Sequence, residues 1–185
     1  MVYIGTIEGA VELRTKRLLL RTYCESDVPA LARLLGAREI AATTLRIPHP
    51  YTESDARLFL LSQQSPASKY GMFELMTGDL VGGVGLVVEE QHKRAELGYW
   101  VGLPCWGKGY ATEGAREMLR HGFEDLKLNR IFAGVFGGNQ ASARVLLKIG
   151  MKYEGTARQH FLKWGQFLDD ECYGILVSEW KQPRS

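Results

Sequence analysis

The chain has 185 residues, of which 45% are hydrophobic and 24% are charged, values typical of a folded globular protein that exclude a disordered or fibrous chain. This length predicts a single domain over residues 1–185. The 23 Lys and Arg against 21 Asp and Glu leave a net charge of +2, which is too small to predict a nucleic-acid partner.

Signals for a membrane or an oxidising compartment are not evident in the sequence. The opening residues 1–5 lack a basic flank followed by an apolar core, and no run approaches the ~18 apolar residues that cross a bilayer. The cysteines Cys24, Cys105 and Cys172 include no C-x-x-C pair and have no histidine at metal-ligand spacing. We therefore expect a cytoplasmic protein with no disulfide, no metal site and no membrane partner.

The first third of the chain predicts one strand followed by helices. Residues 17–21 form an apolar run typical of a buried strand, and Ser26 and Pro29 are residues that start a helix. A second helix is expected to begin at Thr52. The two prolines within residues 37–51 predict a loop between these helices.

The middle of the chain changes from a helical pattern to short strand-like runs, which predict an antiparallel β-meander. Three short runs of β-branched and aromatic residues, 70–76, 80–88 and 95–101, are separated by polar segments. Alternate side chains of a strand share a face, so the third run places Glu96 and Trp100 on the same side of the sheet.

The last part of the chain begins with a glycine-rich turn and ends with a hairpin. Small and apolar residues after the turn recur every three or four positions, which is typical of an amphipathic helix. In chain order, the sequence predicts a helix over residues 111–126, a strand over 130–136, a helix over 139–149 that Gly150 ends, and strands near 153–161 and 170–177.

The turn over residues 107–112 is the candidate binding feature. Gly107 and Gly109 allow a tight bend that directs successive N–H groups toward an anion in front of a helix, so a phosphate group fits there. The same glycines could simply join a strand to a helix. A P-loop is excluded because its sequence is absent, and a dinucleotide fingerprint is excluded because Thr112 stands where a third glycine is required.

With its flanks, this turn resembles the acyl-coenzyme A motif of the GCN5-related N-acetyltransferase (GNAT) superfamily, in its ribosomal-protein N-acetyltransferase-like branch. The matching blocks span about a third of the chain, and the order of flanking elements fits from about residue 12 to residue 178. The general motif Q/R-x-x-G-x-G/A begins with Gln or Arg, where this chain has Trp106, and one side-chain phosphate contact is thereby removed. The blocks are Ala95-Glu96-Leu97-Gly98-Tyr99-Trp100-Val101, Trp106-Gly107-Lys108-Gly109-Tyr110-Ala111-Thr112-Glu113 and Asn139-Gln140-Ala141-Ser142-Ala143-Arg144-Val145-Leu146-Leu147-Lys148-Ile149-Gly150-Met151.

The resemblance implies an α+β fold of the GNAT type: a mixed, mostly antiparallel sheet with a central splay between residues 95–101 and 130–136, and helices on both faces. It implies acetyl-coenzyme A (acetyl-CoA) as cosubstrate, with the pantetheine arm pairing along the splayed strand like an inserted strand. The pyrophosphate would bind the amides of the turn, where the helix dipole favours negative charge. The implied acetyl-CoA-binding residues are Trp100, Val101, Gly107, Lys108, Gly109, Tyr110, Ala111, Thr112, Asn139 and Ser142.

Two residues are candidates for the chemistry. By resemblance, Ser142 lies beside the coenzyme A sulfur and could give the departing thiolate a proton or hydrogen bond, although serine is also common in a first helical turn. Glu96 could orient an incoming amine or take its proton through water, or it could be an exposed strand residue paired with Arg94. Asn139 could bind pantetheine amides, cap its helix, or do both.

The function that the resemblance implies is direct transfer of an acetyl group from acetyl-CoA to a primary amine. An N-terminal α-amine of a protein or peptide, or an amino-acid-like amine, is the expected acceptor, because a site without a strong base suits amines of lower pKa. Its pocket would be walled by residues 37–70 and 154–171. The alternatives are acetylation of a polyamine or antibiotic and a non-catalytic acyl-CoA-binding module. The oligomeric state, monomer or homodimer, stays open.

Overall fold

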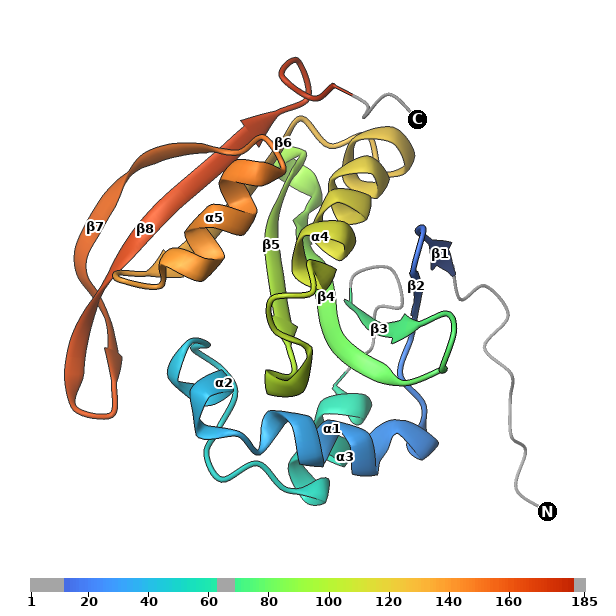
Figure 1. Ribbon diagram of the computed structural model, residues 1–185. Coiled ribbons are helices and arrows are strands. Elements are labelled where there is room, and N and C mark those ends of the chain that lie inside the picture. Colours follow the sequence, from blue (N-terminus) through green and yellow to red (C-terminus); the bar gives the residue numbers. More distant parts are fainter. Residues whose placement is uncertain (1–11, 63–68, 182–185) are drawn as a thin grey trace.

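A computed structural model describes residues 12–62 and 69–181, and in this part of the chain eight strands form one sheet (Figure 1). The predicted domain and pocket ranges therefore include residues outside the description, namely 1–11, 63–68 and 182–185. The strands are β1 (Leu13–Arg14), β2 (Leu18–Arg21), β3 (Lys69–Glu74), β4 (Leu80–Glu89), β5 (Arg94–Val101), β6 (Arg130–Phe136), β7 (Lys152–Lys163) and β8 (Gln166–Leu176).

The sheet has the strand order β1-β2-β3-β4-β5-β6-β8-β7. Among these strands, β5 and β6 are the parallel neighbours and all other pairs are antiparallel. Parallel strands need a crossover, which the helix after the glycine turn supplies between β5 and β6. The prediction of a mixed, mostly antiparallel sheet is confirmed.

Helices cover both faces of the sheet because alternate strand residues are apolar on both sides. In β2, Leu18 and Leu20 belong to one buried cluster, and the intervening Leu19 packs against the other. The first cluster lies under α4 and α5, the second under α1, α2 and α3, which run together along the bottom of Figure 1. The helices are α1 (Val28–Leu35), α2 (Arg38–Ala42), α3 (Glu53–Leu61), α4 (Tyr110–Arg120) and α5 (Gln140–Lys148), with short 3₁₀ segments at Glu25–Asp27, Glu90–His92 and Leu103–Cys105.

Two local predictions were wrong. The segment predicted as a loop over residues 37–51 contains α2, a helix of five residues that is too short to show a helical period and is held by burial of Ile40 and Ala41. The helix predicted to continue from Ala111 to Leu126 is α-helical only to Arg120 and continues as a π-helical turn.

The central splay between β5 and β6 is confirmed. Their ladder joins Arg94–Glu96 to Arg130–Phe132 and ends there, although β5 continues to Val101 and β6 to Phe136. Beyond the ladder, β5 stays paired with β4 and β6 with β8. One side of each strand therefore presents main-chain groups that no neighbouring strand satisfies.

Candidate functional site

A cavity of about 870 Å³ lies where β5 and β6 separate. Part of its lining comes from the face of the sheet that carries α4 and α5. The rest comes from the opposite face, where Ile40 and Thr43 of the α2 region and Leu168 of β8 contribute. The cavity is therefore lined from both faces of the sheet at the splay.

The glycine turn shapes the entrance on the α4 side. Gly107 and Gly109 have φ values of +76° and +83°, a backbone region that residues with a Cβ avoid. Gly109 is the N-cap of α4 and no side chain caps this end within the described residues; the first intrahelical bond is donated by Glu113 N–H to the Gly109 carbonyl. The N–H groups of residues 110–112 thus have no helical acceptor, and they form an anion site that fits a pyrophosphate.

Arg17 of the β1–β2 turn holds this glycine turn in place. Its guanidinium donates to the Lys108 carbonyl at 3.0 Å, forms a salt bridge with Glu113 at 2.7 Å and lies 4.8 Å from the centre of the Tyr110 ring. Thr15 donates its hydroxyl hydrogen to the same Glu113 carboxylate. Burial alone would raise the pKa of Glu113, but the hydrogen bonds from Thr15 and Arg17 outweigh burial and lower it. Glu113 therefore stays ionised and anchors Arg17 beside the turn.

Ser142 and Tyr99 form a hydrogen-bonded pair on the same side of the sheet. The Ser142 and Tyr99 hydroxyl oxygens are 2.7 Å apart, and the Tyr99 hydroxyl is also 3.1 Å from the Ser142 carbonyl oxygen. Burial raises the pKa of Tyr99 to about 12, so the phenol keeps its proton at neutral pH. Asn139 caps α5 by accepting the Ser142 N–H, as its alternative role predicted.

The main chain of β5 faces the splay at alternate residues. Gly102 N–H donates to the Val81 carbonyl on β4. Because the β4–β5 register is continuous, the main-chain groups of Trp100, two residues earlier, also point toward β4. Those of Tyr99 and Val101 therefore point to the splay. The Val101 carbonyl already accepts the Trp106 indole N–H at 2.6 Å, which leaves the Val101 N–H available. The predicted main-chain pairing with the pantetheine arm is thus geometrically possible at Val101. The main-chain groups of Trp100 point to β4 instead.

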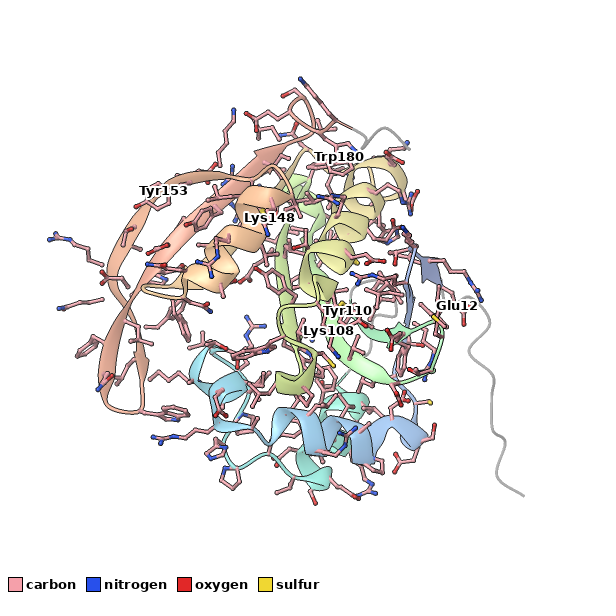
Figure 2. All side chains as sticks on the ribbon, viewed as in Figure 1. Glu12, Lys108, Tyr110, Lys148, Tyr153 and Trp180 are labelled. Carbon is pink, nitrogen blue, oxygen red and sulfur yellow. The ribbon has the colours of Figure 1, made fainter. Side chains whose placement is uncertain are left out.

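The structure brings most of the predicted residues to the cavity. Lys108 does not line it, and Figure 2 shows Lys108 beside Tyr110 at the start of α4. Glu96 is also absent from the lining: it lies opposite Phe132 where the two strands are still paired, four residues or about 13 Å along the strand from Trp100. The predicted residues that do line the cavity are Trp100, Val101, Gly107, Gly109, Tyr110, Ala111, Thr112, Asn139 and Ser142.

Several lining residues were not predicted as functional. The sequence placed Tyr99 only within a block of the family resemblance and gave it no role. Its bond to Ser142 joins residues 43 positions apart, which no local pattern reveals. Arg144 and Lys148, the basic residues of α5 on the cavity side, recur at helical spacing and could have been found from it. Figure 2 labels Lys148 at the C-terminal end of α5.

Comparisons with known proteins agree with this geometry. A family model described as an acetyltransferase (GNAT) domain matches residues 17–152. A putative ribosomal N-acetyltransferase, YdaF of Bacillus subtilis, is 34% identical over 108 residues, which are 58% of this chain and 59% of that protein. The L-amino acid N-acetyltransferase AaaT of Escherichia coli is 29% identical over 149 residues, 77% of this chain and 88% of that protein.

The fold is likewise shared with solved structures. The crystal structure of a GNAT-family acetyltransferase from Bacillus anthracis superposes with a TM-score of 0.84 at 27% identity, covering 91% of this chain and all of that chain. The region that the family model matches includes the splayed strands, the glycine turn and both helices that line the cavity.

Proposed function

The chain belongs to the GNAT family of acetyltransferases and is an acetyl-CoA-dependent N-acetyltransferase, and we propose that its acceptor is an α-amine, either the N-terminus of a protein or peptide or an amino-acid-like amine. One observation supports direct transfer at this site: the cavity is lined from both faces of the sheet at the splay, so donor and acceptor can reach the splay from opposite faces. Holding two reactants in line in this way supplies a large part of the acceleration of such a reaction.

The residues of the chain suggest how acetyl-CoA is held. The amides of residues 110–112 receive the pyrophosphate, and the Val101 N–H is placed to pair with the arm that enters the splay. Bound acetyl-CoA supplies an activated thioester. An amine that attacks the thioester carbonyl generates negative charge on oxygen and then on sulfur, and hydrogen-bond donors fixed in advance stabilise such charge.

Ser142 is the donor proposed for the sulfur. Tyr99 has one hydroxyl hydrogen, and its two acceptors, the Ser142 carbonyl and the Ser142 hydroxyl, compete for it. When Tyr99 donates to the Ser142 hydroxyl, that hydroxyl is free to donate its own hydrogen into the cavity. Because the raised pKa keeps Tyr99 protonated, this arrangement is available over the neutral pH range.

The preference for an α-amine follows from proton equilibria. At pH 7 roughly 10% of an α-amine of pKa near 8 is neutral, against about 0.04% of a lysine side chain of pKa near 10.4. Of the two relatives above, one is named a putative ribosomal N-acetyltransferase and the other an L-amino acid N-acetyltransferase. The acceptor named for the second carries an α-amine, which supports the proposal.

A panel of amines tests the acceptor. Thiol release from acetyl-CoA should be measured with an alanine-terminated tetrapeptide amide, free L-amino acids, an N-blocked lysine peptide, spermidine and an aminoglycoside. We expect the highest kcat/KM for the peptide or an amino acid. A preference for spermidine or the aminoglycoside would refute the α-amine proposal, and binding of acetyl-CoA without turnover of any amine would favour a non-catalytic module.

Ser142→Ala should lower kcat about tenfold and leave the acetyl-CoA Kd unchanged. The effect is smaller than the usual 10²- to 10⁴-fold for a general acid, because a thiolate with a conjugate-acid pKa near 8.5 leaves readily even without a proton. Steady-state kinetics with the best amine of the panel measure kcat, and calorimetry measures Kd. Ser62→Ala, which removes a hydroxyl that donates to the Phe59 carbonyl, is the control. An unchanged kcat in Ser142→Ala would exclude the proposed donor role.

Arg17→Gln should raise the KM for acetyl-CoA about fivefold with little change in kcat. The substitution removes the donor to the Lys108 carbonyl and a charge beside the pyrophosphate site, and a fivefold change corresponds to about 1 kcal/mol. Arg17→Lys should recover part of the loss because it keeps the charge. Arg33→Gln, at an exposed position of α1, serves as control. If KM and kcat changed together in equal measure, Arg17 would have a general structural role instead.

A further inference from the structure

We propose that Asp170 of β8, whose carboxylate lies over Gly134 beside the open part of the splay, binds the acceptor amine and takes its proton before attack. This inference rests on the proposed function, because it assigns a role in the reaction to a residue on the acceptor side of the sheet. Asp170 is not itself among the residues that line the cavity, but it lies between two that are, Phe136 on the paired strand and Leu168 on β8. It gives Asp170 the role that the sequence suggested for Glu96.

Asp170 lies on the face of the sheet from which the acceptor approaches. It pairs directly with Phe136 of β6, and directly paired residues project from the same face. Phe136 lines the cavity, and so does Leu168, two positions before Asp170 and on the same face of β8. This is the face of Trp100 and the α2 wall, opposite the face that carries α4 and α5. Asp170 is therefore on the acceptor side.

Asp170 also lies at the right position along the splay. The β5–β6 ladder ends at Glu96 opposite Phe132, so two residues further on Gly98 and Gly134 stand on opposite sides of the opening. A Cβ built on Gly134 would meet Asp170 Oδ1 at 2.5 Å, which places the carboxylate directly on the backbone of Gly134. A Cβ on Gly98 would meet nothing within 4 Å. The opening is therefore unfilled on the Gly98 side, across from the position that this carboxylate covers, whereas Glu96 lies where the strands are still joined.

The carboxylate of Asp170 lacks a strong hydrogen-bond donor. Its Oδ1 atom has almost no accessible surface and no hydrogen-bond partner of normal geometry among the residues described. Oδ2 has a weak contact with the Cys172 thiol at 3.9 Å, close to the outer limit for a sulfur hydrogen bond. Buried carboxylate oxygens in proteins are usually satisfied, so an unsatisfied one calls for a partner that binds in function. An ammonium group supplies both charge and donors.

The surroundings of Asp170 suit proton transfer. Burial raises the pKa of this carboxyl group, and the charge of His160 on β7, the Val135 main chain and the Cys172 thiol only partly oppose the shift. Burial also raises the pKa of the Cys172 thiol, so that this neighbour stays neutral. A carboxylate with a raised pKa takes a proton from an ammonium more readily than a solvated one does.

Atoms and charges balance in the proposed step. The acceptor R–NH₃⁺ gives one proton to Asp170, and the neutral nitrogen forms the new C–N bond at the thioester carbon. The C–S bond breaks with its electron pair on sulfur. The second nitrogen proton is lost to solvent, and the thiolate gains a proton from the Ser142 hydroxyl, which recovers one from solvent. Asp170 then releases its proton to solvent, so the products are the N-acetyl amine, free coenzyme A and one proton.

Asp170→Asn tests the inference with the tetrapeptide amide as acceptor. We expect kcat/KM for the peptide to fall about 10²-fold, within the usual range for a general base, and the acetyl-CoA Kd to stay unchanged. The defect should shrink from pH 7 to pH 9, because an α-amine of pKa near 8 is mostly neutral at about pH 9 and needs no base. Glu171→Gln is the matched control: its carboxylate is next in sequence and on the other face, where it accepts from Tyr173.

A second variant keeps the test independent of the Asp170 side chain itself. Gly134→Ala places a methyl group at 2.5 Å from Oδ1 and must displace the carboxylate, so we expect a loss similar to that of Asp170→Asn. Activity equal to that of Glu171→Gln in either variant, or a defect that is the same at both pH values, would overturn the assignment of Asp170. Failure of the wild-type protein to acetylate any amine would instead refute the proposed function.

Discussion

Replacing Gly107 and Gly109 together by alanine should weaken acetyl-CoA binding by about 30- to 700-fold. Both residues have positive φ values, and a residue with a Cβ pays roughly 1–2 kcal/mol at each such position. The bend relaxes to avoid this strain, and the N–H groups at the start of α4 then no longer converge on the pyrophosphate. The combined strain of about 2–4 kcal/mol corresponds to this change in Kd, which isothermal titration calorimetry measures.

The control for this experiment is a glycine with the same backbone conformation far from the cavity. Gly78, in the turn between β3 and β4, has φ +76°, and a Cβ added there would meet nothing within 4 Å. Gly78→Ala should lower the melting temperature slightly and leave the Kd for acetyl-CoA unchanged. An unchanged Kd in the Gly107/Gly109 double variant would show that the diphosphate binds elsewhere.

Leu146→Ala should lower the free energy of unfolding by about 2–5 kcal/mol, the usual range for removing a buried leucine side chain. Leu146 is completely buried and is the buried residue of α5, the helix that carries Ser142 and is capped by Asn139. Its loss leaves a cavity under the helix. We expect the melting temperature to fall by about 10 °C and the KM for acetyl-CoA to rise, since α5 lines the cavity.

The neighbouring Leu147 provides the control for this stability measurement. Its side chain is 54% exposed, so Leu147→Ala removes the same atoms from the same helix without opening a cavity. We expect its free energy of unfolding, from urea denaturation, to stay within about 0.5 kcal/mol of the wild-type value. Similar losses in the two variants would mean that α5 is not held by its buried face.

The features that the sequence predicted well are those whose causes lie within a few residues. The positive φ at Gly109, the cap at Asn139 and the alternation along β5 depend on local sterics and on hydrogen bonds three or four residues apart. The central splay, by contrast, was expected only from the resemblance to a known family. No local pattern in residues 130–136 indicates that β6 leaves β5 after Phe132.

The assignment of Glu96 shows the limit of such reasoning. The alternation in residues 95–101 correctly places its side chain on the face of Trp100, but the face alone does not give the position along the opening. That position depends on where the β5–β6 ladder ends. The helix α2 was missed for a related reason, since a five-residue helix is stabilised by the core it covers and not by its own sequence.

The sequence by itself determined the order of the elements apart from β1 and α2, and the glycine turn with its helix, because each is encoded by neighbouring residues. Only the tertiary structure decided which side chains meet across the cavity: Tyr99 with Ser142, Arg17 with Lys108, and Asp170 with Gly134. These contacts join segments that are 36 to 91 residues apart along the chain. Their geometry depends on the register and twist of the whole sheet, which packing on both faces sets and no short segment specifies.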